Sequence, residues 1–322
     1  MTNLNCKSAL VTGGAGFIGS ALCEALVQKG ARVTIVDNLS NGSRQNIEAI
    51  ASQVDFYTMD ICTPEFSNFL IDSDFDFIFH LAANAYVPPS VKNPEFDFQV
   101  NCAGPFHILD TMRRASLHAS LIVNSSAGVY GNPSRLPISE TDLTVPVSPY
   151  GVSKLAMERY LYVFSQLYGI KAASLRLFSV YGPRQFKQIV FDFITKISQN
   201  HAELEILGDG TQVRDLIYVK DVVQALLLVS EHAPMNGEVY NTATGRGYTT
   251  RELAEIIYQA MGLEPNYYYT GCIRPGDPHA WIADITKIKN LGFDPAFSLE
   301  AGIKKTVEWY QANQVPASVE VK

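Results

Sequence analysis

A glycine-rich segment near the N-terminus constrains the fold of this chain more than any other feature. The run Thr12-Gly-Gly-Ala-Gly-Phe-Ile-Gly19 follows Ser8–Thr12, a short apolar segment that predicts a buried strand. Ser20 to Lys29 has the apolar spacing of a helix that Gly30 would end, and Arg32 to Val36 predicts a second strand. In such a unit, glycines let the backbone approach a pyrophosphate, and the helix N-terminus faces its negative charge. The segment therefore predicts a dinucleotide-binding domain.

The alternation of strands and helices continues to about residue 180. Sequence patterns predict strands over 54–59, 75–80, 120–124 and 171–178, and helices over 97–114 and 150–168. Beyond Val180, glycine, proline and aromatic residues become frequent, and helices are predicted over 251–261 and 300–311. We expect an α/β fold with a Rossmann-type doubly wound parallel sheet in residues 1–180, a return segment near 215–240, and a smaller C-terminal α/β substrate-binding domain in residues 181–322.

Composition narrows the class of protein. Of the 322 residues, 47% are hydrophobic and 18% are charged, which predicts a large buried core. The net charge of −7 argues against binding to nucleic acid or to an anionic membrane. The odd number of cysteines, with no C-x-x-C pair, favours reduced thiols over a disulfide framework or a zinc site. No apolar run approaches the roughly 20 residues of a membrane helix. We expect a cytoplasmic protein without a metal.

An acidic residue selects the form of the dinucleotide. Asp37 lies 18 residues after Gly19, at the end of the second predicted strand. A carboxylate at this position accepts hydrogen bonds from a ribose 2′-hydroxyl and repels a 2′-phosphate, which favours NAD over NADP. Arg44 leaves NADP open as an alternative, because a guanidinium in the following loop could bind a 2′-phosphate. Arg44 could instead be a solvated loop charge that binds no phosphate.

A tyrosine and a lysine point to proton transfer. Tyr150 and Lys154 are four residues apart and share one face of the predicted helix. A nearby ammonium stabilises a phenolate, so we expect the pKa of Tyr150 to be lowered. Tyr150 would then remove a hydroxyl proton while hydride leaves for the dinucleotide. The Y-x-x-x-K spacing is common by chance, and without the glycine segment a surface helix pair would explain it.

Together these motifs resemble the extended short-chain dehydrogenase/reductase family, and more narrowly its NAD-dependent sugar-nucleotide epimerase/dehydratase branch, which is UDP-glucose 4-epimerase-like. The resemblance covers nearly the whole chain. Beyond the glycine segment and Tyr150-x-x-x-Lys154, the motifs that follow the order of the family are Asp37-Asn38-Leu39, Asp60-Ile61, His80-Leu-Ala-Ala83, Ser125-Ser126, Val129-Tyr-Gly131, Tyr181-Gly-Pro-Arg-Gln185, Gly208-Asp-Gly210, Arg214-Asp215, Tyr218-Val219, Asp221-Val222 and Arg274-Pro-Gly-Asp277.

The resemblance assigns roles to residues. It implies that the catalytic residues are Ser126, Tyr150 and Lys154, with Ser126 orienting the reacting hydroxyl. The implied cofactor-binding residues are Gly13, Gly16, Phe17, Ile18, Gly19, Asp37, Asn38, Ser40, Asp60, Ile61, Leu81, Ala82, Ala83, Asn101, Tyr150, Lys154 and Phe178. The implied substrate-binding residues are Ser126, Tyr150, Ser179, Arg214 and Arg274. The two arginines would grip the nucleotide diphosphate, although either could instead form a structural ion pair.

The residues after Ser126 distinguish the reactions of this branch. By the resemblance, 4,6-dehydratases carry Asp-Glu directly after the catalytic threonine, and decarboxylases carry a glutamate nearby. Here Ala127 and Gly128 cannot move protons. This favours a UDP-hexose type 4-epimerase that oxidises C4 to a keto-sugar and re-reduces it on the other face, using tightly bound NAD. A dehydratase catalysing 4,6- or 5,6-elimination, or a reductase, is the alternative; an NAD-sensing regulatory protein is a third reading.

The chain also departs from the pattern of the family. Ser179 replaces the usual asparagine before Val-Tyr-Gly-Pro-Arg, and the connector after Gln185 is short. Tyr86-Val-Pro-Pro-Ser90, which should border the sugar, is unusual. Neither the base nor the sugar of the substrate therefore follows from the sequence. The helices predicted over 97–114 and 150–168 carry apolar residues beyond one narrow stripe, and the resemblance implies a homodimer through a four-helix bundle.

Overall fold

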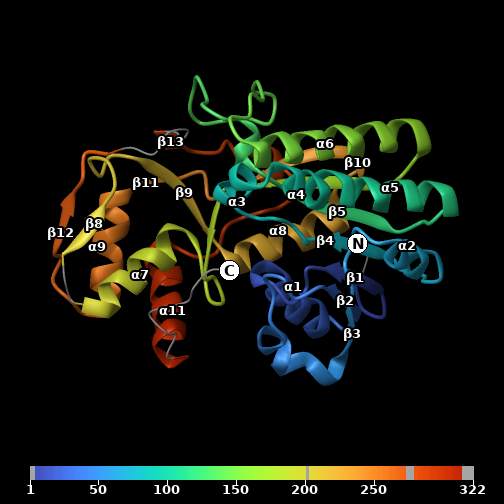
Figure 1. Cartoon of the computed structure of the whole chain (residues 1–322), viewed down its shortest axis with the longest axis horizontal. Helices are drawn as coiled ribbons and strands as arrows, with labels where there is room; N and C mark the ends of the chain where they lie inside the picture. Colours follow the sequence, from blue (N-terminus) through green and yellow to red (C-terminus); the bar gives the residue numbers. More distant parts are fainter. Residues whose placement is uncertain (1–3, 201–202, 273–278, 314–322) are drawn as a thin grey trace.

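The computed structural model, which describes residues 4–200, 203–272 and 279–313, is built around a parallel seven-stranded sheet (Figure 1). The strand order is β10-β6-β5-β4-β1-β2-β3. The winding direction reverses between β1 and β4, and in sheets of this kind the nucleotide crevice lies at the carboxyl ends of the two strands beside that reversal. The strands are β1 Ser8–Thr12, β2 Arg32–Asp37, β3 Val54–Thr58, β4 Phe77–His80, β5 Ser120–Ser126, β6 Ala172–Leu177 and β10 Asn236–Thr242. The predicted Rossmann-type sheet is confirmed.

Helices cover both faces of this sheet. One face packs against α1 (Phe17–Gln28), α8 (Val219–His232) and the 3-10 helix η1 (Arg44–Gln53). The other packs against α2 (Pro64–Ile71), α5 (Gly104–Ala115) and α6 (Pro149–Tyr168). Successive residues of β1 enter different cores, with Ala9 and Val11 in one and Leu10 in the other. This alternation follows from the two-residue period of a strand and explains the unbroken apolar run.

The helix predicted over 97–114 is not continuous. It begins earlier, as α4 (Pro94–Phe98), passes through a π turn at Gln99–Ala103 and continues as α5. Pro105 has no N–H, so it cannot donate the helical hydrogen bond to Asn101, and the backbone adopts a wider turn there. The helix predicted from Ser20 likewise begins earlier, at Phe17, because Gly16 is its N-cap.

A smaller region packs beside the carboxyl ends of the sheet, at the left of Figure 1. Its four-stranded sheet contains β7 Ser179–Tyr181, β9 Val213–Tyr218, β11 Gly247–Thr249 and β13 Ala280–Trp281, and a two-stranded sheet contains β8 Leu204–Ile206 and β12 Tyr267–Tyr269. Its helices are α7 Gln188–Asn200, α9 Thr250–Met261, α10 Thr286–Lys289 and α11 Leu299–Ala312. Between them the chain returns to the large sheet through α8 and β10. The limits 1–180 and 181–322 stay a prediction.

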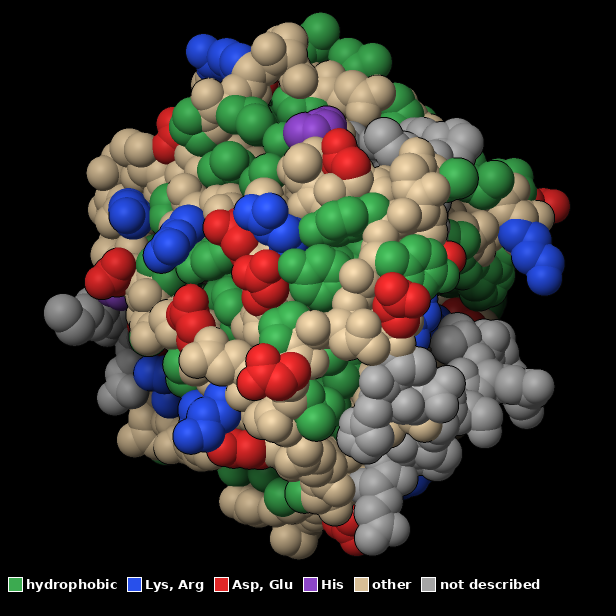
Figure 2. Space-filling view, turned by 90° about the vertical axis from the view of Figure 1, so that its left-hand side faces the viewer, with side chains coloured by type: hydrophobic (Ala, Val, Ile, Leu, Met, Phe, Trp, Pro, Cys, Tyr) green, Lys and Arg blue, Asp and Glu red, His purple; other side chains and the backbone are tan. Residues whose placement is uncertain are grey.

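The outer face of the smaller region carries charges of both signs. Figure 2 shows acidic and basic side chains interspersed with apolar ones over the described residues of this face. Among the described residues, no helix is both long enough and apolar enough to span a membrane. The same part of the chain contains no cluster of His, Cys, Asp and Glu that could hold a metal ion.

Candidate active site

The glycine segment forms a backbone cradle at the end of β1. Gly13 has a φ of +69°, and a Cβ there would lie 2.6 Å from the nitrogen of Ala82, in the segment after β4. A Cβ at Gly19 would lie 2.1 Å from the carbonyl oxygen of Gly13. The N-cap of α1, Gly16, offers no side-chain cap, and the first turn holds no acidic residue. The cradle therefore presents uncapped backbone N–H groups and the positive end of the helix dipole, which suit a pyrophosphate.

Asp37 lies at the end of β2 beside this cradle. Its Oδ2 accepts a hydrogen bond of 3.0 Å from the backbone nitrogen of Ala15, and its Oδ1 accepts one of 2.8 Å from that of Leu39. Burial raises the pKa of the carboxyl group, and these hydrogen bonds counteract the rise. The guanidinium of Arg44 lies over Phe56, with its carbon 4.1 Å from the ring centre, and donates at 3.2 Å to Oγ1 of Thr58, the strand partner of Asp37. The carboxylate, and not the arginine, is therefore fixed at the glycine loop.

Four of the predicted cofactor-binding residues lie along the loops after β2 and β3. Asn38 Nδ2 donates to Asp60 Oδ2 at 2.9 Å, and Asp60 Oδ1 accepts from the Cys62 nitrogen at 2.8 Å. Ser40 donates from its backbone nitrogen to Asn38 Oδ1 at 3.0 Å, and Ile61 is buried behind these loops. The two loops are thus tied to each other on the β2–β3 side of the crevice.

Ser126, Tyr150 and Lys154 come together where β5 ends and α6 begins. Ser126 is the last residue of β5, and its Oγ accepts from the nitrogen of Gly128 at 3.1 Å. The side chain of Ser126 lies close enough to Tyr150 to lower the pKa of its phenol. Lys154 Nζ donates to the carbonyl oxygen of Asn124 at 3.0 Å and lies 5.9 Å from the centre of the Tyr150 ring. A partly exposed phenol and hydroxyl therefore lie beside a buried ammonium in one site.

The expectation of a lowered tyrosine pKa is wrong for this structure. Burial raises the pKa of Tyr150; the hydrogen bond with Ser126 lowers it, and the charge of Asp97 raises it further. Burial lowers the pKa of Lys154 to about 8, whereas the charges of Asp97 and Glu158 act in the opposite direction. Burial is the largest influence on this phenol, because withdrawal from water disfavours the charged phenolate.

Asn101 organises the loop after β4 through a network that sequence reasoning missed in part. Its Oδ1 accepts from the Asn84 nitrogen at 3.1 Å, and its Nδ2 donates to the Asn84 carbonyl at 2.9 Å and to Asp97 Oδ1 at 2.7 Å. Asp97 is fully buried, and its Oδ2 has no hydrogen-bond partner. The four-residue spacing of Asp97 and Asn101 on a helix is the signal that could have found this pair.

A second missed network lies beneath the catalytic residues. Arg176 donates to both carboxylate oxygens of Glu158, at 2.9 and 2.7 Å, and to the hydroxyl of Tyr130 at 2.8 Å. Ser125 Oγ donates to Glu158 as well. The side chains of Arg176 and Glu158 are only 4% and 2% exposed. Glu158 follows Lys154 by four residues on α6, so it joins the helix face that carries the predicted catalytic groups.

The predicted substrate side lies on the smaller region. Ser179 opens β7, and Phe178 before it is buried. Arg214 on β9 donates to the Val213 carbonyl at 2.9 Å, and its guanidinium lies 6.0 Å from the centre of the Trp281 ring. The indole of Trp281 donates to the Gly131 carbonyl at 3.1 Å, shortly after the Ser126–Tyr130 stretch. Arg214 is thus linked through Trp281 to the catalytic loop. The predicted residue Arg274 lies outside the described residues.

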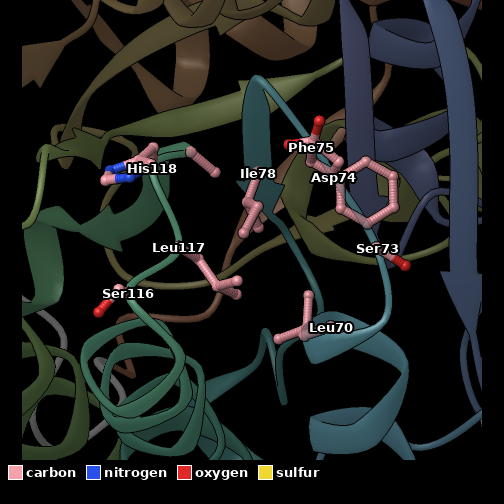
Figure 3. A pocket seen from close by; sticks show the side chains of 9 residues that line it. Leu70, Ser73, Asp74, Phe75, Ile78, Ser116, Leu117 and His118 are labelled. Carbon is pink, nitrogen blue, oxygen red and sulfur yellow. The ribbon is translucent and has the colours of Figure 1, made fainter.

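A cavity of about 110 Å³ lies at the amino ends of the strands, opposite the predicted site (Figure 3). Leu70, Ile78 and Leu117 line it, and His118 lies at its border. These residues surround the amino ends of β4 and β5, whereas the predicted site lies at the carboxyl ends. The cavity is therefore separate from the crevice.

A dinucleotide crevice with a Ser–Tyr–Lys set beside it defines the class of extended short-chain dehydrogenases/reductases. A family model described as GDP-mannose 4,6 dehydratase matches residues 10–306, and the chain belongs to this family.

Similar proteins were found among curated sequences and solved structures. A putative UDP-glucose 4-epimerase of Methanocaldococcus jannaschii is 36% identical over 308 residues, covering 94% of this chain and 98% of the relative. The crystal structure of UDP-glucose 4-epimerase with UDP-glucose from Thermotoga maritima has a TM-score of 0.88 at 37% identity, covering 95% and 99% of the two chains. The UDP-glucuronic acid 4-epimerase of Bacillus cereus, in complex with UDP-glucuronic acid and NAD, has a TM-score of 0.86 at 30% identity, with the same coverage.

Proposed function

We propose that this protein is an NAD-dependent nucleotide-sugar 4-epimerase of the UDP-hexose type. One observation carries the proposal: Ser126, Tyr150 and Lys154 converge beside a dinucleotide crevice, while the residues after Ser126 are Ala127 and Gly128. A Cβ at Gly128 would lie 3.3 Å from Ser126 Oγ and 3.6 Å from the Tyr150 ring. An acid or base at this position would therefore stand at the reacting centre, and the chain has none there.

The residues of the crevice fit NAD. The glycine cradle and the uncapped start of α1 suit its pyrophosphate, and Asp37 suits the 2′-hydroxyl of its adenosine ribose. Asn38, Asp60 and Ile61 would border the adenine, and Lys154 would hold the nicotinamide ribose. When bound, NAD accepts a hydride from the sugar and returns it. Likeness to a 4-epimerase complexed with NAD supports this cofactor.

The side chains of this protein would supply proton transfer and orientation. Tyr150 takes the proton of the sugar 4-hydroxyl as C4 is oxidised, and returns a proton to the 4-keto oxygen when C4 is reduced on its other face. Ser126, whose side chain interacts with Tyr150, orients that oxygen. Lys154 keeps a positive charge beside the phenol.

The substrate would be a nucleoside diphosphate sugar. Arg214, Arg274 and Ser179 are proposed to hold its diphosphate, because guanidinium groups bind phosphate oxygens in a bidentate manner. The uracil base is proposed from relatives that are described as UDP-sugar epimerases.

A dehydratase is the second candidate, because the matching family model carries that description. A panel of UDP-, GDP-, CDP- and dTDP-sugars, with products read by NMR, separates the two. We expect a C4 epimer of a UDP-sugar. A product lighter by one water would establish elimination instead, and net consumption of NADH would establish a reductase.

We also propose a homodimer formed through α5 and α6. Apolar side chains of α6 are exposed on the side of the molecule away from the sheet, with Val152 53%, Tyr160 43% and Leu167 68% exposed. Pairing of α5 and α6 with a second copy would bury them in a four-helix bundle. Light scattering tests this: a mass of one chain, near 35.5 kDa, would contradict the dimer.

A further inference from the structure

The connection between β7 and α7, residues Gly182–Lys187, crosses from the smaller region to the large sheet, and we call it the strap. Arg184 in the strap and Gln188 immediately after it both have a φ of 72°, in the left-handed region. Neither is glycine, so each bend is unfavourable by itself and is kept only where surrounding contacts determine it. The strap is therefore held in a defined conformation.

Contacts at two points hold the strap. Arg184 donates to Ser20 Oγ at 3.1 Å and forms an ion pair with Glu24, both on α1. The ring of Phe186 packs edge-on against Phe191 of α7 and Trp309 of α11, each with centres 5.6 Å away. The strap thus connects the helix that begins at the glycine cradle with two helices of the smaller region.

Lys187 reaches across the crevice from this strap. Its Nζ lies 3.3 Å from Asn41 Oδ1, in the loop after β2, and 5.7 Å from the centre of the Tyr86 ring, in the loop after β4. Strand β1 lies between β2 and β4 in the sheet, and the glycine cradle follows β1. An ammonium that contacts the loops on both sides therefore stands across the opening above the cradle.

Among the residues that the structure describes, Lys187 has no opposite charge beside it. Over the ranges 4–200, 203–272 and 279–313, no ion pair joins Lys187 to a carboxylate, and Asn41 offers it only a neutral oxygen. Partial burial lowers the pKa of Lys187, and no neighbouring charge offsets this. A cation withdrawn from water without a counter-charge is stabilised when an anion binds.

We propose that Lys187 binds the pyrophosphate of the dinucleotide and that the strap retains the nucleotide in its crevice. The proposal rests on the proposed function for the identity of the dinucleotide, but its chemistry requires only a nucleoside diphosphate. An N⁺–H···O⁻ hydrogen bond to a phosphate is stronger than one between neutral groups. Sequence reasoning missed Lys187 because 146 residues separate it from Asn41.

Calorimetric titration of the full chain, freed of nucleotide, tests the assignment with NAD, ADP and adenosine as probes. Lys187→Met removes the charge and keeps the length of the side chain, and Lys187→Arg restores a cation. Lys196→Met is the matched control, because Lys196 on α7 is solvent-accessible and pairs with Asp192 at 2.9 Å. We expect Lys187→Met to weaken NAD and ADP about tenfold and adenosine not at all. Lys187→Arg and Lys196→Met should bind all three like the wild type.

Three results would overturn the proposal: unchanged ADP affinity in Lys187→Met, equal losses for ADP and adenosine, or an equal loss in Lys196→Met. Equal losses for ADP and adenosine would show a collapsed loop and not a missing phosphate contact. A different result would contradict the proposed function: binding of ADP but not of NAD by the wild-type chain. In that case the comparison of variants on ADP still decides the role of Lys187.

Discussion

The two sides of the crevice are built differently. On the cofactor side, backbone lies against backbone: Gly13 leaves no room for a Cβ beside Ala82, and both oxygens of Asp37 accept backbone hydrogen bonds. On the substrate side, side chains extend from short strands: Arg214 donates to the carbonyl of its own neighbour, Val213, and β13, which carries Trp281, has only two residues.

This difference determines where amino-acid substitutions are tolerated. A cradle made from backbone requires particular residues at particular positions, so it can be recognised in the sequence as a motif. A binding surface made from side chains can change its ligand by exchanging one residue for another. The cofactor side therefore defines the reaction class, and the substrate side decides which nucleotide sugar is converted.

The largest effect should come from removing the phenol between the two sides. We expect Tyr150→Phe to lower turnover about 10³-fold while NAD stays bound, because only the group that moves the proton is lost. Steady-state kinetics and the NAD content of the purified variant measure the two quantities. Loss of NAD in parallel with activity would show that Tyr150 belongs mainly to the cofactor side.

The next largest effect should come from breaking the buried ion pair of Arg176 and Glu158, which lies beneath the catalytic residues. Glu158→Gln breaks an ion pair that is almost inaccessible to solvent, and we expect it to lower the free energy of unfolding by about 3–5 kcal/mol. Asp192→Asn, which breaks the exposed pair with Lys196, should cost less than about 1 kcal/mol. Urea denaturation measures both, and equal effects would contradict a supporting role of the buried pair.

The cradle itself can be tested with two glycines of similar φ. Gly13 (φ +69°) faces backbone atoms, whereas Gly262 (φ +70°) has nothing within 4 Å of an added Cβ. We expect Gly13→Ala to weaken NAD binding about 100-fold, because the methyl group displaces the segment after β4. Gly262→Ala should leave the Kd unchanged and lower stability by about 1 kcal/mol. Similar Kd values for the two variants would contradict a backbone-built cradle.

The smallest effect should come from the substrate side. We expect Arg214→Met to raise the KM for a UDP-sugar about tenfold with kcat nearly unchanged, because a diphosphate contact contributes equally before and during the reaction. Arg251→Met, which removes an exposed arginine of α9, is the control. A fall in kcat without a change in KM would place Arg214 at the reacting centre instead.

The sequence predicted the cofactor side well because its geometry depends on short local motifs. The glycine segment, Asp37 and the pair Tyr150–Lys154 each lie within one strand–loop–helix unit. Long-range contacts were not predictable in this way: Arg176 meets Glu158 across 18 residues and Tyr130 across 46, and Lys187 meets Asn41 across 146.

Two further errors have physical causes. The direction of the Tyr150 pKa shift depends on how deeply the phenol is buried, which a motif does not state. The π turn before Pro105 depends on a missing N–H and on the anchoring of Asn101 to Asn84, which a helical pattern of apolar residues does not contain. The first error concerns tertiary packing, the second combines a local effect of proline with packing, and neither concerns the choice of elements.

The most direct test of the central claim is the conversion of UDP-galactose in D₂O without added NAD, followed by NMR and mass spectrometry. A cofactor that is recycled within each turnover returns the same hydrogen to C4. We expect UDP-glucose of unchanged mass, with no deuterium on carbon and no net change in redox state. A product that has lost water or gained deuterium on carbon would contradict the central claim.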